Sequence, residues 1–172
     1  MRTYKILGVL LLIVMISCNQ NQNDTSKAVQ TNSQQKMEIV KKQGIITKVS
    51  SKSFEDTYHT LIEIITNNPN LKIIAQLDHQ ANAASVDLEL NPTRVIMFGN
   101  PKLGTPLMQN SQITGLDLPQ RILIWQDDKD VVHVSYNDPE FLKLRHEIIG
   151  KDDVLTIISK ALDNLSKGAT GA

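Results

Sequence analysis

The stretch RILIWQDDKDVVHVSY, residues 121–136, decides the predicted fold. It contains two apolar runs rich in β-branched and aromatic side chains, residues 121–126 and 131–136, on either side of the polar break DDKD. This pattern is typical of a β-hairpin. Two consecutive strands are therefore expected to pair antiparallel.

Both faces of this hairpin are apolar. Successive side chains of a strand point to opposite faces, so Ile122 and Ile124 share one face and Leu123 lies on the other. The expected strand over residues 94–98 has the same two-sided pattern. Because a large apolar face needs a cover, we expect helices on one side of the sheet. A second subunit, the irregular segment 78–112 or a ligand is expected to cover the other side.

The strongest helix pattern lies over residues 54–65. Phe54, Tyr58 and Leu61 follow one another at helical spacing and form a single apolar stripe, and Ser53 is placed to cap the first turn. A second amphipathic helix is expected to open at Asp152 or Asp153 and to run to about residue 165. Each stripe suits packing against the same face of a sheet.

The order of these elements along the 172-residue chain predicts the fold class. Runs of strands between separated helices are typical of an α+β domain. We expect one such domain over residues 44–172, with an antiparallel sheet of about five strands and two main helices on one face. The expected strands cover residues 44–49, 71–77, 94–98, 121–126 and 131–136, in the order strand, helix, four strands, helix, with short helical insertions.

The amino terminus has the features of a secretory signal. Basic residues precede an apolar run over residues 6–16, which is too short to span a membrane. The following MISC, residues 15–18, resembles the site at which a bacterial lipoprotein is cleaved and acylated on its cysteine. We expect residues 1–17 to be removed and Cys18 to carry lipid. The alternative, an incidental cysteine after a plain signal, would leave a lone thiol in an oxidising compartment.

Residues 18–43 are expected to form a flexible tether. They are rich in Asn, Gln, Ser, Thr and Lys and hold few side chains that could be buried. The expected partner at this end is a bilayer, reached through the lipid on Cys18. In enteric bacteria, an Asp directly after the lipid-bearing cysteine retains a lipoprotein in the inner membrane. This chain has Asn19 at that position. We therefore expect an outer membrane location, facing the periplasm.

A set of short motifs, in order from residue 76 to residue 146, resembles a bacterial and archaeal family known only as domain of unknown function 302. The matching stretches are LDHQA (77–81), NPT (91–93), FGNPK (98–102), GTPLM (104–108), Leu118-Pro119 with Arg121, WQD (125–127), YNDP (136–139) and RH (145–146). The chain departs from its relatives at residues 85–87, where they often have Gly. The resemblance implies a fold similar in outline to TATA-binding-protein-like domains, and homodimers. It implies no activity, because none is established for the family.

Five side chains are candidate ligand-binding residues. His79 follows Asp78 at the expected end of a strand, where a carboxylate could orient an imidazole, although Asp78 could equally cap a turn. The segment 98–105 has the glycines and polar groups of an anion-binding backbone nest, or of a turn-rich crossover. The candidates are His79, Asn100, Lys102, Thr105 and Tyr136.

Several function classes are excluded or disfavoured by composition. Equal numbers of basic and acidic residues, 18 of each, and 4% aromatics do not fit a nucleic-acid binder. The four histidines form no closely spaced pair and the only cysteine is Cys18, so no metal site is assigned. A metal or haem site that assembles across the fold stays open, and the cofactor is unknown. No nucleophile motif is present, so no catalytic residue is assigned.

We therefore expect an envelope lipoprotein whose dimeric, non-catalytic domain binds a small ligand or a partner. The alternative from another class is a metal-dependent or redox enzyme that uses His79 with Tyr136 or His146, which requires these side chains to converge on one cavity. A third alternative is a purely structural dimerising component, which would leave no cavity.

Overall fold

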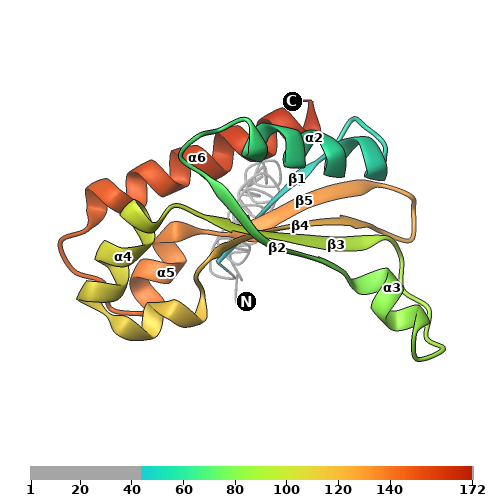
Figure 1. Cartoon of the computed structure of the whole chain (residues 1–172). Helices are drawn as coiled ribbons and strands as arrows, with labels where there is room; N and C mark the ends of the chain where they lie inside the picture. Colours follow the sequence, from blue (N-terminus) through green and yellow to red (C-terminus); the bar gives the residue numbers. More distant parts are fainter. Residues whose placement is uncertain (1–43, 172) are drawn as a thin grey trace, which may run out of the picture. The chain divides into compact units, whose positions relative to one another are not determined.

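A five-stranded antiparallel sheet forms the centre of residues 44–171, the part of the chain that the computed structural model describes (Figure 1). The strands lie in the order β1-β5-β4-β3-β2. Their bounds are β1 (Ile45–Val49), β2 (Lys72–Asp78), β3 (Thr93–Gly99), β4 (Gln120–Gln126) and β5 (Val132–Asn137). The predicted signal peptide over residues 1–17 and the predicted tether over residues 18–43 lie outside the described residues.

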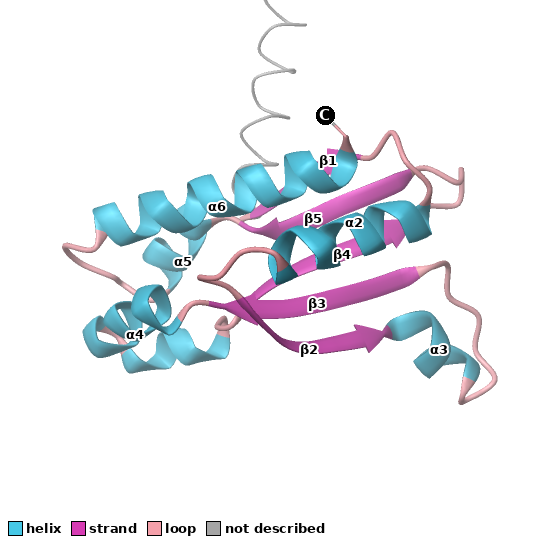
Figure 2. Cartoon of the chain, turned by 45° about the horizontal axis from the view of Figure 1, so that its top comes forward, coloured by secondary structure: helices cyan, strands magenta, loops and turns pink. Residues whose placement is uncertain are grey.

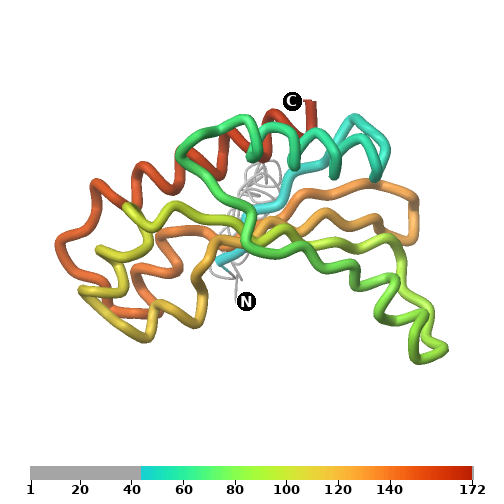
Figure 3. Tube along the Cα trace, in the orientation of Figure 1, coloured from blue at the N-terminus to red at the C-terminus, as the bar shows by residue number. Residues whose placement is uncertain are grey.

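The predicted hairpin is formed by β4 and β5, which pair antiparallel from Gln126↔Val132 to Ile122↔Tyr136. Its turn is stabilised by Asp127, whose Oδ1 accepts hydrogen bonds from the backbone nitrogens of Lys129 and Val131 at 2.9 and 3.0 Å. β1 then pairs antiparallel with the outer edge of β5. The start of the domain thus lies beside its central hairpin, as the tube trace in Figure 3 shows.

Two long helices lie on one face of the sheet, as predicted (Figure 2). These are α2 (Phe54–Thr66) and α6 (Asp152–Thr170), which also pack against each other. The shorter elements are α3 (His79–Ala84), α4 (Pro101–Asn110), the 3₁₀ helix η1 (Gln112–Leu116) and α5 (Pro139–Arg145). Within residues 44–171, no helix is long and apolar enough to cross a bilayer.

The helix starts follow from local side-chain chemistry. Ser53 caps α2 as predicted, because its Oγ accepts a hydrogen bond from the backbone nitrogen of Asp56 at 3.1 Å. Asn100 and Asp138 cap α4 and α5 in the same way, and each is followed by a proline at the first helical position. The end of the segment 78–112, which we expected to be irregular, is thus largely helical.

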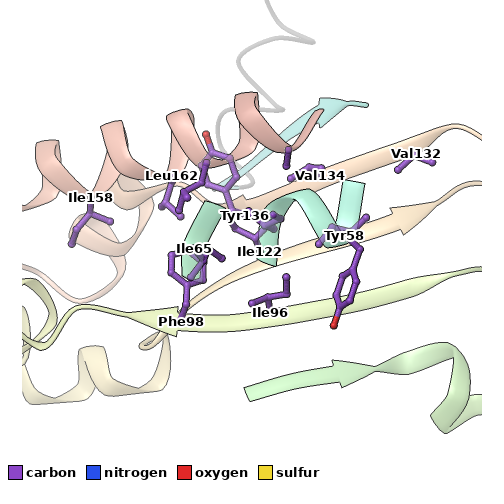
Figure 4. Close-up of a cluster of buried hydrophobic side chains, with 14 of the residues drawn as sticks. Tyr58, Ile65, Ile96, Phe98, Ile122, Val132, Val134, Tyr136, Ile158 and Leu162 are labelled. Atoms are coloured by element: carbon purple, nitrogen blue, oxygen red, sulfur yellow. The ribbon is translucent and has the colours of Figure 1, made fainter. Parts of the chain in front are cut away.

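The hydrophobic core lies between the sheet and the two long helices (Figure 4). Its fully buried members include Leu61 and Ile65 of α2, Ile96 of β3, Ile122 of β4 and Leu162 of α6. The cluster of buried core residues runs from residue 54 to residue 169. Residues 36–172 therefore contain a complete core, and we use this segment in the experiments below.

The predicted alternation along β2 is interrupted by a β-bulge. The pairing of β2 with β3 shifts between Ile73 and Ala75, so Ile74 faces no partner in the register. After the bulge, Gln76 lies on the helix side, where its Oε1 accepts a hydrogen bond from the hydroxyl of Tyr58 at 2.5 Å. Regular alternation over the predicted strand 71–77 would place Leu71, Ile73, Ala75 and Leu77 on one face, and the structure corrects this. The extra residue reverses the faces of the second half of the strand.

The second face of the sheet is only partly covered within the described chain. α3 packs against β3 and lies away from α2, below the sheet in Figure 1. Val95 on this face is buried, whereas Ile45 and Val49 of β1 are 48% and 59% exposed. α3 contacts one edge of this face without burying a residue of its own, and the β1 edge stays open.

Candidate functional site

The candidate site is a pocket beside α4, which we call the α4 pocket. It lies where the ends of β2 and β3 meet α4 and the middle of α6, and its volume is about 370 Å³. This is within the range of roughly 300–1,000 Å³ typical of small-ligand sites. The wall is mainly apolar and consists of Leu71, Lys72, Ile74, Phe98, Gly99, Asn100, Pro101, Leu103, Gly104, Thr105, Met108, Gly115, Leu118, Pro119, Gln120, Ile158, Ala161 and Leu162.

The bulge in β2 contributes directly to this pocket. Ile74, the residue without a register partner, is part of the pocket wall and is 57% exposed. Bulges redirect a side chain that regular pairing would hold in place. The irregular strand therefore adds apolar surface at the point where the sheet meets α4.

Gln120 is the only buried polar side chain among the described residues that line the pocket. It is 8% exposed, and its Nε2 has no hydrogen-bond partner within residues 44–171. Leaving a buried amide donor without a partner costs about 1–3 kcal/mol. A ligand with a hydrogen-bond acceptor would remove this cost. Sequence reasoning missed Gln120, although a glutamine on the apolar face that Ile122 and Ile124 share was a usable signal.

Two of the five predicted ligand-binding residues line the pocket. Asn100 and Thr105 form part of its wall, while Lys102 is exposed on the same helix and does not. Of the two alternatives for this segment, the local hydrogen bonds favour the turn-rich crossover, because Asn100 accepts from the backbone donors that a nest would offer. Its Oδ1 accepts from the nitrogen of Lys102 at 2.9 Å, and its carbonyl oxygen accepts from those of Leu103 and Gly104 at 3.0 Å. The loop thus contributes to a pocket, while its backbone donors at residues 102–104 are engaged within the loop.

His79 lies at the opposite end of β2, as the first residue of α3. Asp78 does not orient its imidazole. One carboxylate oxygen of Asp78 accepts from the backbone nitrogen of Ala81 at 2.9 Å, and the other accepts from Nε of Arg94 at 2.7 Å. The Ala81 hydrogen bond and the Arg94 guanidinium lower the pKa of Asp78 below its usual value. Asp78 therefore caps a helix and forms an ion pair, and His79 does not line the α4 pocket.

Tyr136 is part of the core and not of the pocket. It is 4% exposed and lies between β5 and α6 (Figure 4), where burial raises the pKa of its hydroxyl. The register Gln76↔Ile96, Ile96↔Ile122 and Ile122↔Tyr136 places it three strands away from β2. Three inter-strand spacings of roughly 4.8 Å therefore separate Tyr136 from β2, a distance of about 14 Å.

The residues of the enzyme alternative are not brought together. His146 is buried, and its Nε2 lies 2.6 Å from Oδ2 of Asp117 in a separate hydrogen-bonded contact. His79 begins α3 at the far end of β2, and Tyr136 is enclosed in the core. No group of three or more metal-ligating side chains is present in the described part of the chain. The enzyme alternative required these side chains to converge on one cavity, and in the structure they do not.

A polar cluster on the second face was not predicted. The rings of Trp125 and His133 stack at 4.2 Å between centroids, and His133 Nε2 lies 2.9 Å from Oδ2 of Asp127. The indole nitrogen of Trp125 donates to Oγ of Ser135 at 2.9 Å, and Ser135 also hydrogen-bonds with Thr47 at 2.8 Å. Asp127 lies in the β4–β5 turn, and the other side chains belong to the adjacent strands β1, β5 and β4. The sequence did not show that β1 pairs with β5, so it could not place Thr47 beside Ser135.

Comparison with known families identifies the family of this chain. The family model described as Domain of unknown function DUF302 matches residues 46–165. The chain belongs to the DUF302 family. This confirms the resemblance predicted from its motifs, and the family description names no activity.

Curated relatives and a solved structure are similar to this DUF302 chain. Two relatives, "Fluoride-specific ion channel FluC 1" of Brucella suis biovar 1 (strain 1330) and of Brucella abortus biovar 1 (strain 9-941), are each 33% identical over 129 residues. The match covers 74% of this chain and 50% and 47% of the relatives, so the chain spans about half of their length. The crystal structure of an uncharacterized conserved DUF302 protein from Bacillus stearothermophilus gives a TM-score of 0.65 at 15% identity, covering 73% of this chain and 98% of that one. This structural likeness shows the fold.

Proposed function

We propose that the DUF302 domain of this chain binds a small, mainly apolar ligand in the α4 pocket without converting it. The observation that carries the proposal is the buried, unpartnered amide of Gln120 in an apolar wall. Apolar surface supplies affinity, and one directed donor supplies orientation. The described wall residues include no Cys, His, Asp or Glu side chain, which supports binding over catalysis.

We further propose that the domain is held at a membrane. The support is the lipoprotein-like signal, with Cys18 as the lipid-bearing residue and an outer membrane, facing the periplasm, as its location. The curated relatives are named ion channels, which supports attachment to a membrane but does not bear on which membrane. Since the match covers about half of those chains, channel activity forms no part of the proposal.

Self-association through the second face of the sheet is also proposed. Ile45 and Val49 of β1 are exposed there, next to the cluster formed by Trp125 and His133. Exposed apolar side chains that lie beside a polar cluster in this way occur in protein interfaces. The α4 pocket lies on the helix side, so a dimer of this type would leave it accessible.

The ligand proposal is tested by calorimetric titration of residues 36–172 with 2-octanone, an apolar chain with one acceptor. We expect saturable binding that Ala161→Leu abolishes, because Ala161 lies in the pocket wall and the larger side chain fills it. Gln120→Leu should weaken 2-octanone binding about tenfold, the loss of one buried hydrogen bond. Ala84→Leu, on exposed α3, is the matched control and should bind as the wild type does. Absence of binding, or binding that Ala161→Leu leaves intact, would overturn the proposal.

A further inference from the structure

A second cavity adjoins the α4 pocket. Its volume is about 500 Å³, and four residues line both cavities: Leu71, Asn100, Leu103 and Ala161. The shared wall means that the two spaces are neighbouring parts of one groove between α6, α4 and the loop that joins α2 to β2. A ligand longer than the α4 pocket would therefore extend into the second cavity.

The wall of the second cavity is also mainly apolar, but its polar residues differ from those of the first. Four of its ten lining residues are asparagines, so we call it the asparagine chamber. Asn68 and Asn70 come from the loop after α2, Asn100 caps α4, and Asn164 lies on α6. No Asp, Glu, His, Lys or Arg is among the residues of the described chain that line it. Three separate segments thus place neutral amide groups around one space.

Two of these amides are held in fixed orientations. The side-chain oxygen of Asn68 accepts from the backbone nitrogen of Asn70 at 3.0 Å, and that of Asn100 accepts from the backbone nitrogen of Lys102 at 2.9 Å. Because these oxygens are engaged in the protein, the NH₂ groups are the ends that the two side chains offer to a ligand. The exposed amides of Asn70 and Asn164 can both donate and accept.

We propose, on the basis of the proposed function, that the ligand is an uncharged amphiphile with one hydrocarbon chain and a head group that carries several hydroxyls. The chain occupies the α4 pocket, and the head group lies in the asparagine chamber. Hydroxyl groups donate and accept, as carboxamides do, so they match the four asparagines in the chamber wall. A charged head group in the chamber would lose hydration without gaining an opposite charge.

The nearest competing ligand is a fatty-acid anion. Lys72 is the one charged residue among the described residues of the α4 pocket wall, and it could pair with a carboxylate. Its side chain is exposed and lies outside the asparagine chamber, which favours the neutral head group. The two ligand types share the alkyl chain, so a comparison at constant chain length isolates the head group.

The experiment titrates residues 36–172 with octyl β-D-glucoside below its micellar concentration, and with sodium octanoate. We expect the glucoside to bind more tightly, by about tenfold. The double variant Asn70→Ala/Asn164→Ala should weaken glucoside binding about tenfold and leave octanoate and 2-octanone binding unchanged, because it alters only the chamber. The turn after α2 is kept, since Asn68 supplies its side-chain oxygen. Asn82→Ala on α3 is the matched control, and each single variant is measured in case the double variant unfolds.

The outcomes separate this inference from the proposed function. Equal affinity for the glucoside and octanoate, or an unaffected double variant, would show that the asparagines do not recognise the head group and would overturn the inference alone. Tighter octanoate binding that Lys72→Met removes would assign the ligand to fatty-acid anions instead. If neither amphiphile nor 2-octanone binds, the proposed function itself fails. A monoacylglycerol that binds like the glucoside would show that hydroxyl groups, and not a sugar ring, are recognised.

Discussion

At the scale of single residues, Asp78 links three parts of the fold by charge. It caps α3 through Ala81, and it pairs with Arg94, whose guanidinium also lies 2.8 Å from Glu55 of α2 and 5.0 Å from the ring centre of Tyr58. Both contacts of Asp78 favour its ionised form, which is why its pKa in the folded state is lowered. A folded-state pKa below the unfolded value adds stability above the unfolded pKa, and this stability is lost as the pH falls through the folded pKa.

The Asp78→Asn variant tests this linkage. Asn keeps a capping oxygen but loses the charge, so the variant should be less stable than the wild type at pH 7, by about 0.5–1 kcal/mol for a partly exposed pair. The difference should shrink toward zero as the pH falls below about 4. Urea unfolding at pH 7, 5 and 3 measures it, with the exposed Asp87→Asn as the control. A difference that is the same at pH 3 and pH 7 would contradict the assignment.

At the scale of elements, two glycines that precede β1 and α6 occupy the left-handed region in different surroundings. Gly44, before β1, has φ of +63°, and a Cβ there would overlap the ring of Phe141 on α5. Gly150, before α6, has φ of +65°, and a Cβ at that position would have no neighbouring atom within 4 Å. Both positions require a left-handed backbone, but only at Gly44 does a side chain of another element, Phe141 of α5, also occupy the space that a Cβ would need.

The paired variants Gly44→Ala and Gly150→Ala separate these two effects. Gly150→Ala should cost about 1 kcal/mol, the backbone penalty alone. Gly44→Ala should cost clearly more, because the ring of Phe141 must also move and the junction of β1 with α5 loosens. Thermal unfolding of both variants measures the difference. Equal losses would show that the Phe141 contact adds nothing.

Elements were easier to predict from the sequence than the site. The hairpin over residues 121–136 and the helix capped by Ser53 depend on local patterns, and both formed where expected. The bulge at Ile74 could not be foreseen, because it depends on how β2 pairs with β3. The same holds for the α4 pocket: its α4 residue Thr105 was found from a local motif, but its α6 wall, including Ala161, comes from a distant segment.

At the scale of the whole molecule, the open β1 edge of the second face predicts self-association. We expect residues 36–172 to be a dimer by native mass spectrometry. Val49→Asp should shift it toward monomer, because a charge there would be buried at the interface. Leu144→Asp, on exposed α5, is the matched control and should not change the mass. A wild-type monomer, or a Val49→Asp dimer of unchanged stability, would contradict interface formation at this face.

Trp125 gives these proposals a common optical reporter. It is the only tryptophan in the chain, and its indole is stacked on His133 on the face opposite α2 and α6, outside both cavities. Protein fluorescence excited at the indole band therefore originates from one place in the fold. Dilution that separates subunits at the second face should change the emission maximum, whereas filling the groove on the helix side should leave it unchanged. A shift of the emission maximum therefore reports assembly and not filling of the groove, without any added label.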